Sequence, residues 1–114
     1  MFYEVRTYQL KNGGIAEYLK VVGDQGIAIQ KRHLGHLIAY FHSEIGSINQ
    51  IMHIWEFASL DDRQARRAAL AADPQWQAFL PKIRDLILTG DNRIMSAAEF
   101  SPIGGAAGAT RLST

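Results

Sequence analysis

The order in which extended and helical periodicity alternate is the feature that most limits the folds open to this chain. Residues 2–10, FYEVRTYQL, are rich in aromatic and β-branched side chains and stop at the turn sequence NGG at 12–14, so they predict a strand. From residue 15 to about residue 32, apolar side chains recur at helical spacing, although Gly23 and Gly26 weaken the middle. The chain therefore begins with a strand followed by a helix.

A hairpin is predicted next, because two extended runs, 36–45 and 48–57, are separated only by Gly46-Ser47. Glycine at the first central position suits a two-residue type II′ turn. With that turn, Tyr40 lies opposite His53 across the antiparallel ladder.

The second half begins with a helix-start signal. The segment SLDD at 59–62 has the form of a capping box, and the helix that it starts is expected to stop before Asp73-Pro74. That dipeptide can begin another helix, which Pro81 should kink or break. Residues 92–100 are expected to form the last strand.

The resulting order of strand, helix, strand, strand, helices and strand is that of the α+β ferredoxin-like fold, βαββαβ. In that fold, four antiparallel strands form one sheet with helices on one face. The other face is bare, and a second copy of the chain is the simplest cover for it. We therefore expect a homodimer that pairs through the sheet face.

The predicted hairpin has two unlike faces. The apolar face is expected to lie beneath the helices and holds Leu37, Ala39, Phe41, Ile45, Ile48, Met52 and Ile54. The bare face is expected to hold a mixed aromatic and polar set, namely Tyr40, His42, Glu44, Asn49, His53 and Trp55. On this assignment, His53 lies away from the helices, at the surface that the second copy or a ligand would cover.

Composition limits the class of protein. The 114 residues suffice for one domain, which we place at residues 1–100, followed by a Gly/Ala-rich tail at 101–114 that is expected to be flexible. The formal net charge of +1 indicates no preference for nucleic acid, and no apolar run is long enough for a membrane span. Cysteine is absent, which excludes disulfides and thiolate chemistry. We expect a cytoplasmic location.

The candidate catalytic residues are His53 and Tyr40, because an imidazole moves protons near neutral pH and a neighbouring phenol can orient it. Arg6 could hold a carboxylate or an enolate. The candidate ligand-binding residues are Arg6, Tyr8, Tyr40, Glu44, Asn49, His53 and Trp55. The histidines have no metal-ligand spacing, and the glycines form no phosphate-binding pattern, so neither a metal nor another cofactor is expected.

Structural explanations stand beside these functional ones. His53 can be a hydrogen-bonded interior group, and Glu44 and Arg6 can neutralise each other across a subunit interface. Trp55 and Trp76 can be anchors of the core or of an interface. The arginines at 63, 66 and 67 are most simply a solvated helix face.

Seven segments together resemble the NIPSNAP family in order and spacing. They are VRTYQLKNGG, SEIGSIN at 43–49, HIW at 53–55, SLDDRQARRAAL, DPQW, DNRIM and FSP, and the resemblance covers roughly residues 2–102. It implies a ferredoxin-like domain that pairs into a dimeric α/β barrel and is similar to stand-alone bacterial members. It implies no established reaction.

Three functions are compatible with the sequence. The first is a dimeric protein that binds a small apolar or aromatic molecule on the polar and aromatic sheet face. The second is a cofactor-independent monooxygenase or isomerase of the dimeric barrel type, which rests on fold analogy alone. The third is a non-catalytic scaffold or interaction protein whose sheet face is filled by its partner subunit.

Overall fold

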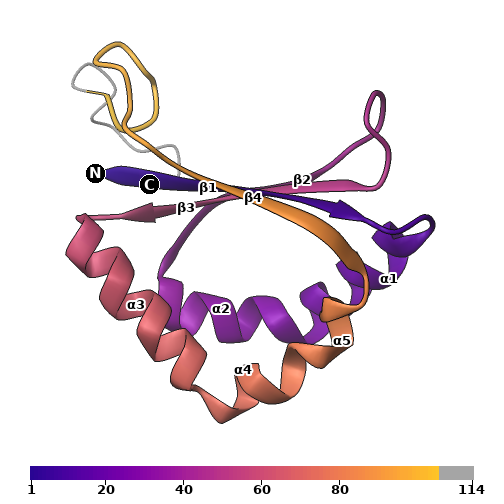
Figure 1. The fold of residues 1–114 in the computed structure, drawn as a ribbon. Coiled ribbons are helices and arrows are strands. Elements are labelled where there is room, and N and C mark those ends of the chain that lie inside the picture. The colour runs from indigo at the N-terminus through magenta and orange to yellow at the C-terminus, as the bar shows by residue number, and fades with distance from the viewer. Residues whose placement is uncertain (106–114) are drawn as a thin grey trace.

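The N-terminal strand lies inside a four-stranded antiparallel sheet of order β2-β3-β1-β4. The structure is a computed structural model and describes residues 1–105. The strands lie side by side above a layer of helices, which covers only one face of the sheet (Figure 1). The strands are β1 (Phe2–Leu10), β2 (His36–His42), β3 (Gln50–Phe57) and β4 (Ile87–Met95). This arrangement confirms the predicted ferredoxin-like α+β fold.

The helix layer is built from two segments of the chain. The first follows β1 as α1 (Gly14–Val21), the π-helical turn η1 (Val22–Gly26) and α2 (Ile27–Leu34). The second follows β3 as α3 (Leu60–Ala72), α4 (Pro74–Phe79) and α5 (Pro81–Arg84). The break between α4 and α5 falls at Pro81, as predicted, because proline cannot donate the helical hydrogen bond.

The π-helical turn η1 contains Gly23 and Gly26, the two glycines that weaken the helical pattern in the sequence. A Cβ atom at Gly26 would lie 2.5 Å from Cζ of Phe79, so only glycine lets α4 approach this closely. A Cβ atom at Gly23, in the same turn, would meet nothing within 4 Å, because this residue faces open space. Gly26 therefore serves packing between the two helical segments.

Helix α3 begins at the predicted cap. The Ser59 hydroxyl accepts a hydrogen bond from the backbone N–H of Asp62 at 3.0 Å. The Asp62 carboxylate accepts one from the N–H of Ala58, also at 3.0 Å, and another from Arg66 Nε at 2.9 Å. The serine cap is thus formed, the Asp62 side chain reaches back to the N–H just before the cap, and the predicted pair between Asp62 and Arg66 is confirmed.

The last strand is shifted toward the N-terminus, since it runs over Ile87–Met95 rather than over the predicted residues 92–100. The sequence Thr89-Gly90-Asp91 resembles a turn, but β1 pairs with it in regular antiparallel register. Gly90 lies opposite Tyr8, where the tyrosine ring packs against the glycine backbone. The neighbouring strand, which is distant in sequence, therefore overrides the local turn signal.

The predicted pairing of Tyr40 with His53 is confirmed, although the hairpin turn is longer than expected. The strands end at His42 and begin again at Gln50, and residues 43–49 form the connection. The Ser43 hydroxyl accepts from the N–H of Gln50 at 3.1 Å and so closes the ladder. The placement of Glu44 and Asn49 on the sheet was wrong, since both lie in this connection.

The two faces of the sheet are the reverse of those predicted. His53 and Trp55 are fully buried, and Tyr40 bonds to Tyr18 of α1, so the aromatic and polar face lies beneath the helices. Their core partners include Leu10, Ile51, Phe57, Val22, Leu34, Trp76, Phe79, Ile83 and Leu86. The prediction failed because the polar groups of this face find partners in the helices, so they do not require an exposed surface.

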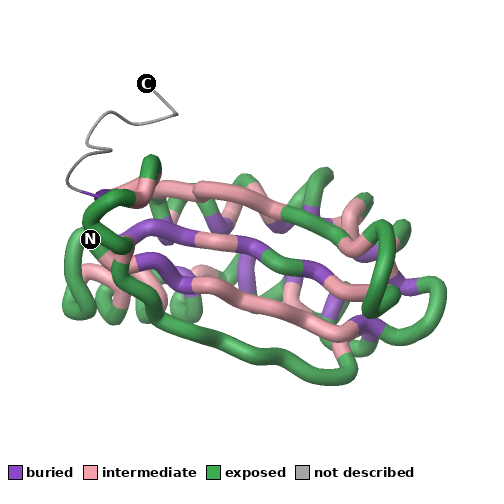
Figure 2. The backbone as a smooth tube through the Cα atoms, turned by 90° about the horizontal axis from the view of Figure 1, so that it is seen from above, coloured by how far each residue is buried: buried purple, intermediate pink, exposed green. Residues whose placement is uncertain are grey.

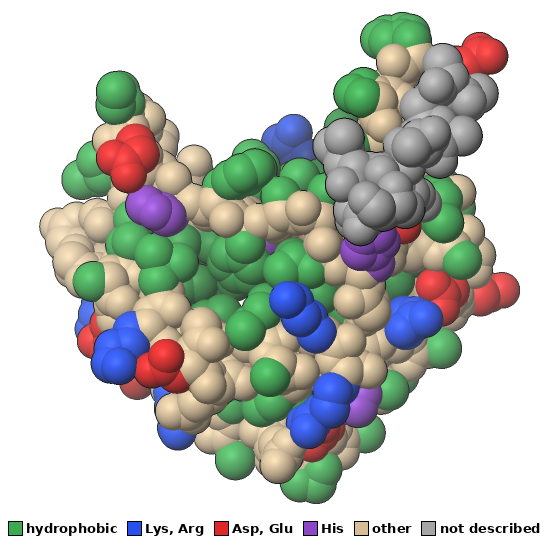
Figure 3. Space-filling view, turned by 180° about the vertical axis from the view of Figure 1, so that it is seen from behind, with side chains coloured by type: hydrophobic (Ala, Val, Ile, Leu, Met, Phe, Trp, Pro, Cys, Tyr) green, Lys and Arg blue, Asp and Glu red, His purple; other side chains and the backbone are tan. Residues whose placement is uncertain are grey.

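The face without helices is apolar over β1, β2 and β3, and Arg93 and Asp91 of β4, opposite Val5 and Thr7, add a charged pair at its edge. It carries Val5 and Ile54 at its centre, half buried, with Met52 and Phe41 more exposed beside them. The connection 43–49 and the segment 96–105 rise on either side, and hydrophobic side chains gather between them (Figure 3). Seen from above, β4 is exposed along nearly its whole length (Figure 2). We call this surface the open face.

Candidate functional site

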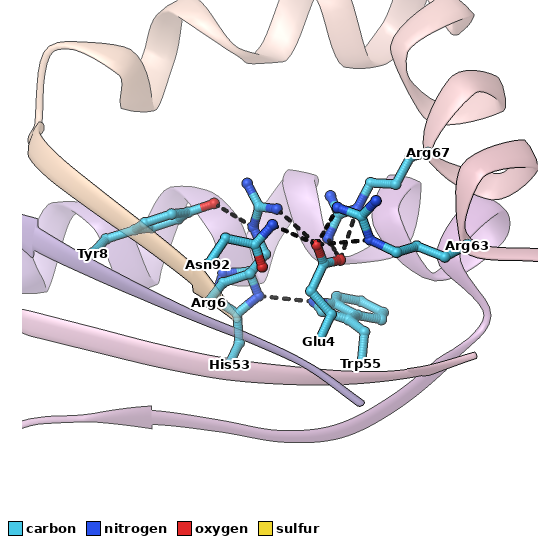
Figure 4. Close-up of polar contacts among 8 residues, drawn as sticks. All are labelled: Glu4, Arg6, Tyr8, His53, Trp55, Arg63, Arg67 and Asn92. Atoms are coloured by element: carbon cyan, nitrogen blue, oxygen red, sulfur yellow. Dashed lines mark hydrogen bonds and ion pairs between the residues drawn. The ribbon is translucent and has the colours of Figure 1, made fainter. Parts of the chain in front are cut away.

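Glu4 of β1 is the centre of a cationic cluster between the sheet and α3 (Figure 4). Its Oε1 atom accepts from Arg67 Nε at 3.0 Å and from Arg67 Nη2 at 2.6 Å. Its Oε2 atom accepts from Arg63 Nη2 at 2.6 Å, from Asn92 Nδ2 at 2.8 Å and from Arg6 Nη1 at 3.2 Å. The carboxylate is therefore ionised and saturated with donors.

The charges explain how a carboxylate is held in the core. Burial by itself raises the pKa of Glu4, but hydrogen bonds from Arg63 and Arg67 outweigh it and lower the pKa to about 2. The two arginines lie four residues apart on α3 and so project from the same helix face. The prediction of a solvated arginine face was wrong for these two, because both reach inward to Glu4.

The cluster carries more positive than negative charge. Arg6, Arg63 and Arg67 share the single carboxylate of Glu4, which leaves two positive charges unbalanced within hydrogen-bond distance. Arg6 also donates from Nε to the Tyr8 hydroxyl at 3.0 Å. Within the described residues 1–105, Arg6 Nη2 and Arg67 Nη1 make no hydrogen bond. These two nitrogens can therefore donate hydrogen bonds to a ligand.

A chamber of about 200 Å³ lies beside this cluster, between the sheet and the helices. Its polar lining comes from Arg6, Tyr8, Tyr18, Gln30 and Arg67. Its apolar lining comes from Val22, Trp76, Leu80, Ile83 and Ile87. The chamber combines aromatic and aliphatic walls with a few polar groups, as sites for small molecules do.

Gln30 is an unusual member of the chamber wall. It lies on α2 and is only 6% exposed, and its Oε1 atom has no hydrogen-bond partner among the described residues. Buried amide oxygens are almost always paired, because leaving one unpaired costs about 1–3 kcal/mol. Gln30 therefore offers a vacant acceptor to whatever enters the chamber.

His53 lies one layer behind the chamber wall. Its Nδ1 atom accepts from Trp55 Nε1 at 2.8 Å, and because an indole N–H can only donate, the neutral imidazole carries its proton on Nε2. Burial, together with nearby Arg6 and Arg67, lowers the pKa of His53 to about 3. The ring is neutral at physiological pH, and its Nε2 has no hydrogen-bond partner within residues 1–105.

Tyrosines surround His53. The Tyr40 ring stacks on the imidazole with 4.5 Å between ring centroids, and the Tyr8 ring meets it edge-on at 5.2 Å. The hydroxyls of Tyr40 and Tyr18 are 2.6 Å apart and share a hydrogen bond. Burial raises the pKa of both Tyr18 and Tyr40, so neither is a phenolate at neutral pH.

The structure therefore separates the predicted site residues into three groups. Arg6 and Tyr8 line the chamber. Trp55, His53 and Tyr40 are packed behind it and do not line it. Glu44 and Asn49 lie apart, in the connection 43–49. Within the chain, Arg6 pairs with Glu4.

Several chamber residues were absent from the predicted site. Tyr18 and Gln30 were assigned only to a helix, Arg67 to a solvated surface, and Trp76 to an anchor. The available signal for Arg67 was that it follows Arg63 by four residues, which puts both side chains on one helix face. The sequence also left Glu4 on β1 without an assigned partner. No local signal distinguishes Gln30.

The open face has a polar group of its own. The Glu56 carboxylate accepts from the Tyr3 hydroxyl at 2.6 Å and lies 3.0 Å from His36 Nδ1. Next to it, Tyr3, Val5, Ile54 and the segment 96–103 contribute to an open apolar hollow of about 500 Å³. The predicted tail begins here, but its residues 106–114 lie outside those described.

Residues 1–105 contain neither a metal-binding cluster nor a helix suited to a membrane. No group of three or more histidine or acidic side chains is arranged to hold a metal ion in that part of the chain. None of its helices has the length and hydropathy needed to cross a bilayer.

Fold and site together define a ferredoxin-like α+β domain with a cationic chamber under its sheet. Residues 3–102 match the model of the NIPSNAP family, and the Drosophila melanogaster protein NipSnap is 33% identical over 101 residues, covering 88% of this chain. The chain belongs to the NIPSNAP family. It spans only 36% of the length of that relative and 41% of human NipSnap homolog 3A.

Solved structures agree with this assignment. A NIPSNAP family protein with unknown function from Agrobacterium tumefaciens is 67% identical, with a TM-score of 0.89 over 90% of this chain and 93% of its own. An uncharacterized NIPSNAP-like domain protein from Burkholderia xenovorans is 40% identical, with a TM-score of 0.86 over 89% and 88%. An antibiotic biosynthesis monooxygenase, at 16% identity and a TM-score of 0.59 over 86% and 99%, shares the fold alone.

Proposed function

We propose that this protein binds a small molecule in the chamber between the sheet and the helices. The observation that carries the proposal is that a space of about 200 Å³ adjoins cations with unused donors and a buried amide oxygen without a partner among the described residues. A fold that had only to fill its core would leave neither the space nor the unpaired groups. The proposed site therefore lies on the helix side of the sheet, and not on the bare face where the sequence led us to expect it.

Binding has more support than acid–base catalysis. Among the described residues, the chamber lining includes no carboxylate, histidine or lysine that could exchange a proton near neutral pH. His53, the predicted catalytic candidate, is neutral and lies behind the wall. A monooxygenase or isomerase activity therefore rests only on the likeness of fold, and a scaffold role alone leaves the chamber unexplained.

We also propose that two copies pair through the open face. Val5, Ile54, Met52 and Phe41 form an apolar surface on a sheet that the helices leave uncovered. Such a surface is stabilised by removing it from water, and in a two-fold dimer the same face of a second chain would cover it. The cytoplasmic location stays a prediction.

A retention experiment tests the chamber even though the identity of the ligand is open. The purified protein is incubated with cell extract, washed, and analysed by mass spectrometry for retained small molecules. Ile87→Trp fills the chamber, while Leu88→Trp adds the same side chain at an exposed neighbour that does not line it. We expect the wild type and Leu88→Trp to retain a molecule that Ile87→Trp loses. Equal retention by all three, or by none, would overturn the proposal.

A further inference from the structure

We propose that the ligand of the chamber is a small hydroxy-carboxylic acid, with the carboxylate held by Arg6, Arg67 and Tyr8 and the hydroxyl donated to Gln30. This inference rests on the proposed binding function and names the chemical class of the ligand. Four features of the chamber carry it, namely its charge, its donors, its acceptor and its size.

The charge of the cluster favours an anion. Glu4 neutralises only one of three guanidinium groups, and Arg6 and Arg67 both face the chamber. The side chains of Arg6 and Arg67 are only 23% and 20% exposed, so water compensates them incompletely. An anion in the chamber would interact with them in a medium less polarisable than water, where charge pairs are stronger.

The free donors have the number and kind that a carboxylate accepts. Arg6 Nη2 and Arg67 Nη1 are unused within the described part of the chain. The Tyr8 hydroxyl accepts from Arg6 Nε, so its own proton is free to be donated. These groups come from β1 and α3 and line one chamber, and charge-assisted bonds of this kind are among the strongest in proteins.

The vacant acceptor adds a second requirement. Gln30 Oε1 is buried in the same chamber and unpaired within residues 1–105, and an amide oxygen can only accept. A simple carboxylate has no proton to give it, whereas a ligand that also carries a hydroxyl satisfies both ends of the site. A ligand without that donor leaves the penalty of the buried oxygen in place.

Size and lining limit the body of the ligand. A cavity of roughly 150 Å³ holds one benzene molecule, so about 200 Å³ suits one ring, or its aliphatic equivalent, with one or two small substituents. Trp76, Leu80, Ile83 and Val22 supply apolar walls for such a body. The hydroxybenzoates are therefore suitable probes of the inferred class.

Calorimetry on the whole protein tests the class directly. The probes are the three hydroxybenzoates, benzoate, and the neutral amide of the best hydroxybenzoate. The side-chain indole signal of Trp76 in ¹⁵N NMR, assigned with Trp76→Phe, locates binding in the chamber. We expect the best hydroxybenzoate to bind at least about tenfold more tightly than its amide, because bonds to charged groups are worth that much. We also expect it to bind more tightly than benzoate.

Substitutions connect each end of the probe to a residue. Arg67→Gln should weaken the best hydroxybenzoate by about tenfold or more, and Arg67→Lys by less. Arg84→Gln, which makes the same charge change at an exposed residue of α5 outside the chamber lining, should have no effect. Gln30→Met should remove the advantage of the hydroxybenzoate over benzoate while leaving benzoate binding within about twofold.

The outcomes distinguish this inference from the proposed function. If the amide binds as well as the acid, or Gln30→Met keeps the advantage of the hydroxyl, the ligand class is wrong and the chamber remains a binding site. If no probe moves the Trp76 signal while Ile87→Trp still abolishes retention from extract, the class is again wrong and the binding function stands. If retention also fails, both are overturned.

Discussion

Arg67 donates two hydrogen bonds to the same carboxylate oxygen of Glu4, from Nε at 3.0 Å and from Nη2 at 2.6 Å. Arg63 makes the matching contact with the other oxygen, one turn earlier on α3. One buried carboxylate of β1 thus fixes the helix over the sheet and fixes the direction of both guanidinium groups. The shape of the chamber wall follows from this contact.

Replacing Glu4 with Gln should destabilise the protein strongly. The substitution leaves three arginines facing each other without a counter-charge, and breaking a buried ion pair from one side costs about 3–5 kcal/mol. Urea unfolding at pH 7, followed by circular dichroism, measures the loss. Asp24→Asn is the control, because its pair with Lys20 is exposed on the helix layer and should contribute less than about 1 kcal/mol. A loss no larger than the control's would contradict the account.

His53 should make stability depend on pH in the weakly acidic range. Unfolded His53 binds a proton near pH 6.5, whereas burial near Arg6 and Arg67 lowers its folded pKa to about 3. Between these values only the unfolded chain is protonated, so stability falls as pH falls from about 6.5 toward 3. The loss between pH 7 and pH 5 is on the order of 2 kcal/mol.

His53→Gln isolates this contribution, since glutamine keeps an acceptor for the Trp55 indole and does not titrate. Urea unfolding of the wild type and the variant at pH 7 and pH 5 measures it. The difference in stability between the two pH values should be smaller in the variant by about that amount. The same difference in both proteins would show that His53 is protonated equally in the folded and unfolded states.

Gly26→Ala should destabilise the junction of the two helical segments. The new methyl group would overlap the buried Phe79 ring, and overpacking of this kind costs about 1–3 kcal/mol, which exceeds the gain in helix propensity. Thermal unfolding of Gly26→Ala and Gly23→Ala makes the comparison, because Gly23 lies in the same π-helical turn with open space beside it. The control should be neutral or slightly more stable.

Met52→Lys tests the open face as a dimer surface. Met52 lies near the start of β3 on that face, and a lysine there would place a charge inside the proposed interface. Sedimentation velocity should give twice the mass of one chain for the wild type and a single-chain mass for the variant. Leu60→Lys, at an exposed residue of α3, should remain dimeric. A monomeric wild type would reject the pairing.

Much of the fold can be predicted from the sequence because its signals are local. The cap at Ser59, the break at Pro81 and the pairing of Tyr40 with His53 each depend on residues within a short stretch of the chain. The strand at Ile87 was missed in its first five residues because β1, distant in sequence, supplies its hydrogen bonds.

The site was harder to predict because its residues are neutralised by distant partners. Glu4 and Arg67 are 63 positions apart, and each alone suggests a solvated residue. The mixed face of His53 and Trp55 was therefore assigned to the bare side, although mutual bonding lets it lie under the helices. Which face is buried depends on such pairs, and periodicity alone gives only which residues share a face.

A crystal of the wild-type protein soaked with the best-binding hydroxybenzoate tests the central claim most directly. We predict electron density for the ring in the chamber, with the carboxylate within hydrogen-bond distance of Arg6 and Arg67 and the hydroxyl within hydrogen-bond distance of Gln30. Density on the open face alone, or a chamber closed by its own side chains around Trp76, would contradict it.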